Sequence, residues 1–178
     1  MIKITGLTKI YPTGTPALRH LNLHINAGEF VSIVGQNGTG KTTLVKMLIA
    51  EERPNKGTIE IGGWDITNIN SNEIPYLRRQ IGVVFQDFKL LPKRTVYENI
   101  AFALEVAGEH GHRIDQIVPQ VLEIVNLSHK ADSYPPQLSG GEQQRTAIAR
   151  SLVHRPKIIV ADEPTGNLDS INAAEIVS

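Results

Sequence analysis

Cysteine is absent from this sequence of 178 residues, which excludes disulfide bridges and thiolate chemistry and is typical of a reducing compartment. Net charge is absent as well, because lysine plus arginine equal aspartate plus glutamate at 18 each. No bulk attraction to nucleic acid or to anionic lipid is therefore expected. No apolar run approaches the roughly 20 residues of a membrane span, and residues 1–4 lack the organisation of a signal peptide. We expect a cytoplasmic protein with no nucleic-acid partner and no direct membrane insertion.

The main feature of the sequence is a phosphate-binding motif, the P-loop. Residues 35–42 read Gly35-Gln36-Asn37-Gly38-Thr39-Gly40-Lys41-Thr42 and match the pattern G-x-x-x-x-G-K-[ST]. The apolar, β-branched residues 30–34 before the motif predict a buried strand, and residues 43–50 after it predict a helix. Loop N–H groups and the positive end of this helix would bind a polyphosphate. Lys41 would reach the β- and γ-phosphates, and the Thr42 hydroxyl would be a ligand of a bridging Mg²⁺.

Two segments that alternate apolar and polar residues precede the motif. Residues 2–7 and 21–25 predict an antiparallel β ribbon joined by a loop rich in proline, glycine and threonine. Tyr11 lies at the mouth of this loop, where an aromatic ring can stack on a nucleotide base. The alternative is that the ring only packs at the end of a strand.

Strands and helices follow in the middle of the chain. Turn signals at residues 54–57 and 62–63 enclose a short predicted strand. Residues 81–85 predict an apolar strand that ends at Gln86, a place where open α/β sheets carry ligand groups. A helix is predicted over residues 95–106, with Thr95 and Glu98 as a capping box. A second helix is expected to start its first regular turn at Pro119, and the two make an α-helical insert.

A second anion site is predicted at the start of a later helix. Ser139 is placed to cap this helix, and Gly140 and Gly141 leave the N–H groups of its first turn unshielded. The inward face of the helix is predicted to comprise Ala147, Ile148, Ser151 and Leu152.

Residues 156–163 predict an apolar strand that ends in two carboxylates, Asp162 and Glu163. One carboxylate at such a position can hold the Mg²⁺ of a P-loop site, and its neighbour can polarise the attacking water.

Five segments resemble motifs of ABC-transporter ATP-binding subunits. In chain order they are residues 35–42 (Walker A), Gln86 (Q-loop), residues 138–143 (signature), residues 158–163 (Walker B) and residues 167–169 (D-loop). The resemblance implies an α/β fold of P-loop NTPase type, with a RecA-like parallel sheet, an N-terminal antiparallel β subdomain and an α-helical insert. It implies one domain over residues 1–178: residues 1–85 form the antiparallel subdomain and P-loop core, 86–137 the insert, and 138–178 the signature helix, Walker B strand and D-loop.

The family carries a switch histidine beyond the Walker B glutamate, but none of the six histidines follows Asp162. We expect a truncated chain with a weak or absent ATPase activity.

The resemblance also implies the roles of individual residues. It implies an ATPase that binds ATP and Mg²⁺ and forms an ATP-dependent, head-to-tail dimer with a second copy of itself. Glu163 and Gln86 would be catalytic, the metal ligands would be Thr42, Gln86 and Asp162, and Asp169 would act across the interface. The nucleotide would be bound by Tyr11, Gly35, Gln36, Asn37, Gly38, Thr39, Gly40, Lys41, Thr42 and Thr43 of one copy and by Ser139, Gly140 and Gly141 of the other.

Within the family, residues 84–92, 95–99 and 101–106 are most similar to the cell-division members, whose partner is an integral membrane protein of FtsX type. This similarity implies a peripheral position on the cytoplasmic face of the cell membrane. Phe88, Leu90 and Leu91 are candidates for anchoring the partner, or else they are buried against the insert. Two alternatives remain open: an ATPase of a lipoprotein-release or macrolide-export transporter, and a nucleotide-gated scaffold that does not need hydrolysis.

Overall fold

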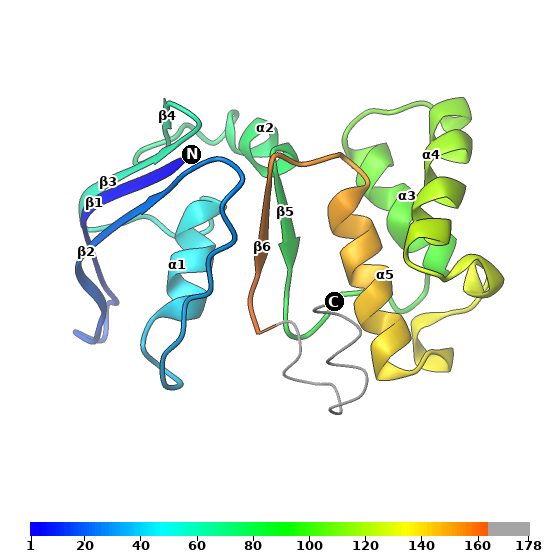
Figure 1. The fold of residues 1–178 in the computed structure, drawn as a ribbon, viewed down its shortest axis with the longest axis horizontal. Helices are drawn as coiled ribbons and strands as arrows, with labels where there is room; N and C mark the ends of the chain where they lie inside the picture. The colour runs from blue at the N-terminus through cyan, green and yellow to red at the C-terminus, as the bar shows by residue number, and fades with distance from the viewer. Residues whose placement is uncertain (164–178) are drawn as a thin grey trace. The chain divides into compact units, whose positions relative to one another are not determined.

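The computed structural model describes residues 1–163, and the chain divides into two compact units (Figure 1). The first unit is Met1–Leu77 and the second begins at Arg78. The short helix α2 (Ile74–Arg79) spans the boundary between them.

The first unit is built on a four-stranded antiparallel sheet with the strand order β2-β1-β3-β4. Its strands are β1 (Ile2–Ile10), β2 (Pro16–Ile25), β3 (Lys56–Ile61) and β4 (Trp64–Asp65). β1 pairs with β2 from Ile2↔Ile25 to Ile10↔Pro16, and it pairs with β3 on its other side. The predicted antiparallel ribbon and the predicted short strand are therefore confirmed.

Helix α1 (Lys41–Leu48) belongs to the first unit and follows the P-loop. Leu44, Met47 and Leu48 are buried, as their spacing on one helical face predicts. The helix begins two residues earlier than expected, because Lys41 and Thr42 of the motif already form its first turn.

The segment before the P-loop differs from the prediction. The structure assigns no strand to residues 30–34, and Phe30 and Val34 are 93% and 88% exposed. A parallel strand takes its hydrogen bonds from neighbouring strands, whereas all four described strands of the first unit pair with one another in the antiparallel sheet. Apolar, β-branched composition is a local property, but pairing needs a partner elsewhere in the chain. The prediction of a buried strand here is wrong.

The second unit combines a pair of parallel strands with helices. Strand β5 (Ile81–Val84) pairs in parallel with β6 (Ile158–Ala161) from Ile81↔Ile158 to Val84↔Ala161. The helices are α3 (Val96–Val106), α4 (Gly111–Ile124) and α5 (Gly140–Leu152), with short 3-10 turns η1 (Ser128–Lys130) and η2 (Pro135–Gln137). β6 is less buried than its apolar sequence predicts, since Ile159 is 59% exposed.

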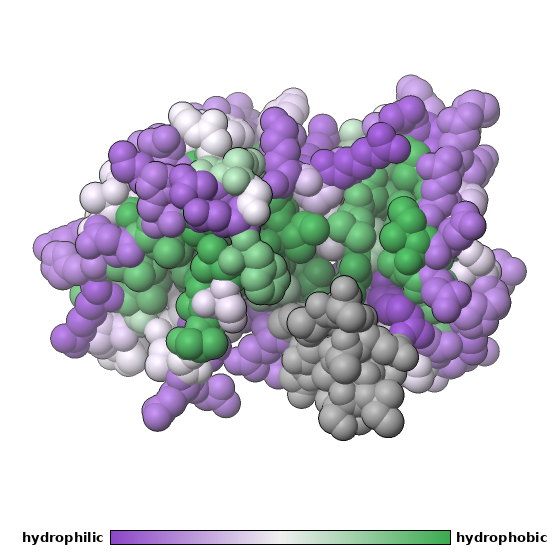
Figure 2. All heavy atoms as spheres, in the orientation of Figure 1, coloured by the Kyte–Doolittle hydropathy of each residue, from purple (hydrophilic) through white to green (hydrophobic). Residues whose placement is uncertain are grey.

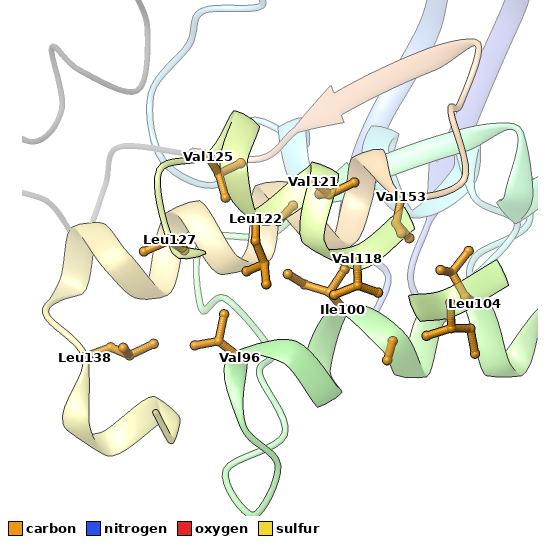
Figure 3. Close-up of a cluster of buried hydrophobic side chains, with 13 residues drawn as sticks. Val96, Ile100, Leu104, Val118, Val121, Leu122, Val125, Leu127, Leu138 and Val153 are labelled. Atoms are coloured by element: carbon orange, nitrogen blue, oxygen red, sulfur yellow. The ribbon is translucent and has the colours of Figure 1, made fainter. Parts of the chain in front are cut away.

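A hydrophobic core joins α3, α4 and α5 of the second unit (Figure 3). Val96, Ile100 and Leu104 come from α3, and Val118, Val121 and Leu122 from α4. Hydrophilic residues cover the outer side of α4, at the right of the view in Figure 2. On α5, Ala147 and Ser151 are buried as predicted, while Ile148 and Leu152 are only half-buried.

Helix α4 begins at Gly111, although the sequence predicts its first regular turn at Pro119. Inside a helix a proline removes one backbone hydrogen bond and costs about 3 kcal/mol. Ile114 and Val118 before the proline share one buried face with Val121 and Leu122 after it. Burying each such side chain contributes about 1.5 to 3 kcal/mol, so the core outweighs the cost of the proline. The predicted start is wrong because it considers backbone preference alone.

Candidate nucleotide-binding site

The P-loop ends at Gly40, which is the N-cap of α1 and has φ 96°. A Cβ atom at Gly40 would lie 2.3 Å from the carbonyl oxygen of Ala17 in β2, so only glycine fits between the helix and the ribbon. No side chain caps α1. The N–H groups of a helical first turn have no intrahelical acceptor, and an uncapped N-terminus is suited to an anion such as a phosphate.

Lys41 lies over the loop that precedes it. Its Nζ donates to the carbonyl oxygens of Gly35 at 2.9 Å and Gln36 at 3.2 Å. The Thr39 hydroxyl also donates to the Gln36 carbonyl, at 2.8 Å, which closes the loop. The ammonium group is thus held at the mouth of the loop, where phosphate oxygens are stronger acceptors than neutral carbonyl oxygens.

Tyr11 is half-buried beside the first turn of α1. Its hydroxyl lies 3.2 Å from the Thr43 hydroxyl, and Lys9 Nζ lies 5.3 Å from the centre of its ring. Lys9 is itself held by Glu52, with 2.6 Å between Nζ and Oε2. The structure therefore brings Tyr11 next to the predicted phosphate-binding residues, whereas the adjacent Thr42 is exposed.

In the second unit, β5 and β6 bring Gln86 and the two carboxylates to one edge. The backbone N–H of Asp162 donates to the Val84 carbonyl oxygen at 2.9 Å, which continues the parallel ladder past Ala161. Gln86 follows Val84 by two residues and is exposed, whereas Asp162 is only 9% exposed. Glu163 follows with a positive φ of 48°. The carboxyl ends of these parallel strands thus carry the predicted metal and water ligands of this unit.

Ser139 caps α5 as predicted. Its hydroxyl oxygen accepts from the Glu142 N–H at 3.3 Å, and the Glu142 carboxylate accepts from the Ser139 N–H at 2.8 Å. Glu142 is not among the predicted site residues, although the spacing of a serine and a glutamate three residues later indicates this capping box. The cap uses a lone pair of the Ser139 oxygen, so its hydroxyl proton can still be donated to an anion.

The backbone N–H of Ser139 lowers the pKa of Glu142 below its ordinary value, against a smaller opposing effect of burial. Lys130, at 3.5 Å from the carboxylate, adds to the lowering. Glu142 is therefore a charged carboxylate at neutral pH, and it stabilises the positive end of the helix that carries Gly140 and Gly141.

Arg150, near the carboxyl end of α5, is also not among the predicted site residues. Its guanidinium donates to the carbonyl oxygens of Phe88 at 2.7 Å and Lys89 at 2.6 Å. Both of these residues have left-handed backbones, with φ of 54° and 48°, which costs about 1–2 kcal/mol per residue. Hydrogen bonds from a charged donor contribute about 1.5–3 kcal/mol each, enough to hold this loop. No local sequence signal indicates a contact that spans 61 residues.

Each unit carries its own part of the predicted site. The first unit holds Tyr11 and residues 35–43, and the second holds Gln86, Asp162, Glu163 and the segment 139–141. The D-loop residues 167–169, including Asp169, lie outside the residues that the structure describes.

Comparison with known proteins identifies the family. A family model described as "ABC transporter" matches residues 18–166. The chain belongs to this family. It is 54% identical over 177 residues to the "Cell division ATP-binding protein FtsE" of Bacillus subtilis, covering 99% of this chain and 78% of that protein. It is 47% identical over 169 residues to the protein of the same name from Escherichia coli strain K12, covering 95% of this chain and 76% of that protein.

Solved structures support the same assignment. The ATP-binding cassette MJ0796, described as dimeric in a post-hydrolysis state bound to ADP and Pi, superimposes with a TM-score of 0.90 at 37% identity, over 99% of this chain and 79% of that one. The cassette cbiO1 of Clostridium perfringens superimposes with a TM-score of 0.88 at 34% identity, over 98% and 70% of the two chains. The predicted α/β fold of P-loop NTPase type is confirmed, and the chain is an ATP-binding ATPase of the ABC type. Within residues 1–163, no helix is both long and apolar enough to cross a membrane.

Proposed function

We propose that this chain is the ATP-hydrolysing subunit of a cell-division complex, in which it drives an integral membrane protein of FtsX type. The observation that carries the proposal is its likeness to cell-division ATP-binding proteins of Bacillus subtilis, Mycobacterium tuberculosis and Escherichia coli, at 47–54% identity over at least 95% of this chain. In this proposal the subunit lies on the cytoplasmic face of the membrane, because its partner is held there.

We assign the phosphates of ATP to the P-loop. The uncapped first turn of α1 and the N–H groups of residues 35–43 would surround the phosphates, and Lys41 would exchange its carbonyl acceptors for phosphate oxygens. Tyr11 would flank the base from its position beside Thr43.

The metal ligands would be Thr42, Gln86 and Asp162. Their hydroxyl, amide and carboxylate oxygens form the donor set that Mg²⁺ prefers. Bound there, Mg²⁺ would neutralise charge on the β- and γ-phosphates. Glu163, next to Asp162 at the end of β6, would orient the attacking water and accept its proton.

We further propose that two copies close head-to-tail around ATP. Ser139, Gly140 and Gly141 of one copy would donate hydrogen bonds to the γ-phosphate bound by the other, from an α5 N-terminus that Glu142 orders. Because ATP supplies this acceptor and ADP does not, hydrolysis would open the dimer, and closure would do work on the membrane partner. The half-buried Phe88, Leu90 and Leu91, after Gln86, are the candidate contact with that partner.

Complementation tests this proposal. A bacterium lacking its own FtsE would be supplied with this chain, with Lys41→Ala or with Glu163→Gln, and scored for cell division and for copurification of its FtsX. We expect neither variant to restore division to the level that the unaltered chain supports. Restored division by Glu163→Gln would instead support a non-hydrolytic scaffold. Copurification of a lipoprotein-release or macrolide-export membrane protein in place of FtsX would support a transporter.

A further inference from the structure

The loop that follows Gln86 is held in an unusual conformation. Phe88 and Lys89 are consecutive non-glycine residues with left-handed backbones. The Phe88 N–H donates to the Phe85 carbonyl at 3.2 Å, and Lys89 Nζ lies 4.4 Å from the centre of the Phe85 ring. Two such residues in succession persist only where the surroundings stabilise them. The loop therefore depends on contacts outside itself.

The contact that stabilises it comes from α5. The Arg150 guanidinium donates to the carbonyl oxygens of both strained residues, at 2.7 and 2.6 Å. Arg150 is largely desolvated, which lowers its pKa, while Asp87 in the same loop acts in the opposite direction. An arginine side chain stays charged in proteins, so a cation bridges the two carbonyl oxygens.

A second close approach fixes α5 against the strand that leads to Gln86. A Cβ atom at Gly82 in β5 would lie 2.7 Å from the carbonyl oxygen of Ser151, the residue after Arg150. α5 therefore contacts the chain before Gln86, at Gly82, and after Gln86, at Phe88 and Lys89. Gln86 lies between these two contacts.

We propose that Arg150 is the positioning residue for Gln86: by holding the Phe88–Lys89 backbone, it fixes the amide of Gln86 at the place where the metal ion and the attacking water would bind. The inference rests on the proposed role of Gln86 as a metal ligand. It implies that α5, whose N-terminal end carries residues 139–141, moves together with the loop that follows Gln86. A shift of the helix on ATP-dependent closure would then be transmitted directly to the Gln86 amide.

The experiment compares Arg150→Ala with Arg113→Ala in the full chain. Arg113 is an exposed arginine on α4 that pairs with Glu109 at 3.6 Å, so the control makes the same chemical change away from the loop. Affinity for ATP is measured with Mg²⁺ and with EDTA, together with kcat and the thermal unfolding midpoint. We expect Arg150→Ala to lower both kcat and the gain in affinity from Mg²⁺ by about tenfold or more, as loss of an outer-shell partner does. Affinity in EDTA should stay at the value of the unaltered chain.

Two rescue variants separate positioning from general damage. Arg150→Lys should recover part of the Mg²⁺ effect, because one ammonium keeps the charge but lacks the planar fork. Lys89→Gly in the Arg150→Ala background should also recover part of it, since glycine adopts the left-handed conformation without strain. Equal behaviour of Arg150→Ala and Arg113→Ala would overturn the inference, as would equal loss of affinity with and without Mg²⁺. If the unaltered chain gains no affinity from Mg²⁺, the proposed function fails and this inference fails with it.

Discussion

Replacing Gly40 by alanine tests the close approach between the P-loop and β2. The new Cβ would lie 2.3 Å from the Ala17 carbonyl oxygen and 2.8 Å from Leu18 Cδ2, at a residue with φ 96°. Left-handed backbone strain costs about 1–2 kcal/mol for a residue with a side chain. Forcing extra atoms into a packed region adds about 1–3 kcal/mol. We expect Gly40→Ala to lower the free energy of unfolding by about 2–5 kcal/mol, the sum of these two effects.

Gly38→Ala is the matched control, because Gly38 has a similar φ of 82° and no heavy atom within 4 Å of an added Cβ. It should show the backbone strain alone, about 1–2 kcal/mol. Urea unfolding followed by the fluorescence of Trp64, the one tryptophan of the sequence and a residue of β4, reports on the first unit. Equal losses of stability for the two variants would refute the close approach of α1 to β2.

Three further predictions concern the site. In a version as long as the relatives, Glu163→Gln should leave ATP affinity intact and lower turnover by about two to four orders of magnitude, the contribution of a positioned proton acceptor, and unchanged turnover would assign that role to another residue. Tyr11→Ala should weaken ATP but not inorganic triphosphate, and an equal effect on both would show that the ring is only structural. Because the folded state lowers the pKa of Glu142, its charge stabilises the fold above the ordinary pKa of 4.5, and this contribution is lost as the pH falls through the folded pKa. The difference in the free energy of unfolding between the unaltered chain and Glu142→Gln should therefore disappear in acid. A difference that stays constant from neutral pH down into acid would contradict the capping role.

Local sequence patterns determined most of the site chemistry. The P-loop pattern places Lys41 and Thr42 directly before a helix, because the loop and the helix are consecutive in the chain, and in the structure the two residues form the first turn of α1. The capping box of Thr95 and Glu98 forms as predicted, since its hydrogen bonds join residues only three positions apart. Gln86 and Asp162 each follow an apolar strand, as the sequence predicts, but the parallel pairing that brings both to one edge joins distant segments and depends on the tertiary structure.

Tertiary structure decided the features in which distant contacts oppose or replace local preference. Residues 30–34 have the composition of a strand but no described strand of their unit pairs with them, since strand pairing depends on a neighbour. α4 continues through Pro119 because burial on both sides of the proline outweighs one lost hydrogen bond. The left-handed backbones of Phe88 and Lys89 are held at their carbonyl oxygens by the guanidinium of Arg150, more than 60 residues away, a contact that only folding brings about.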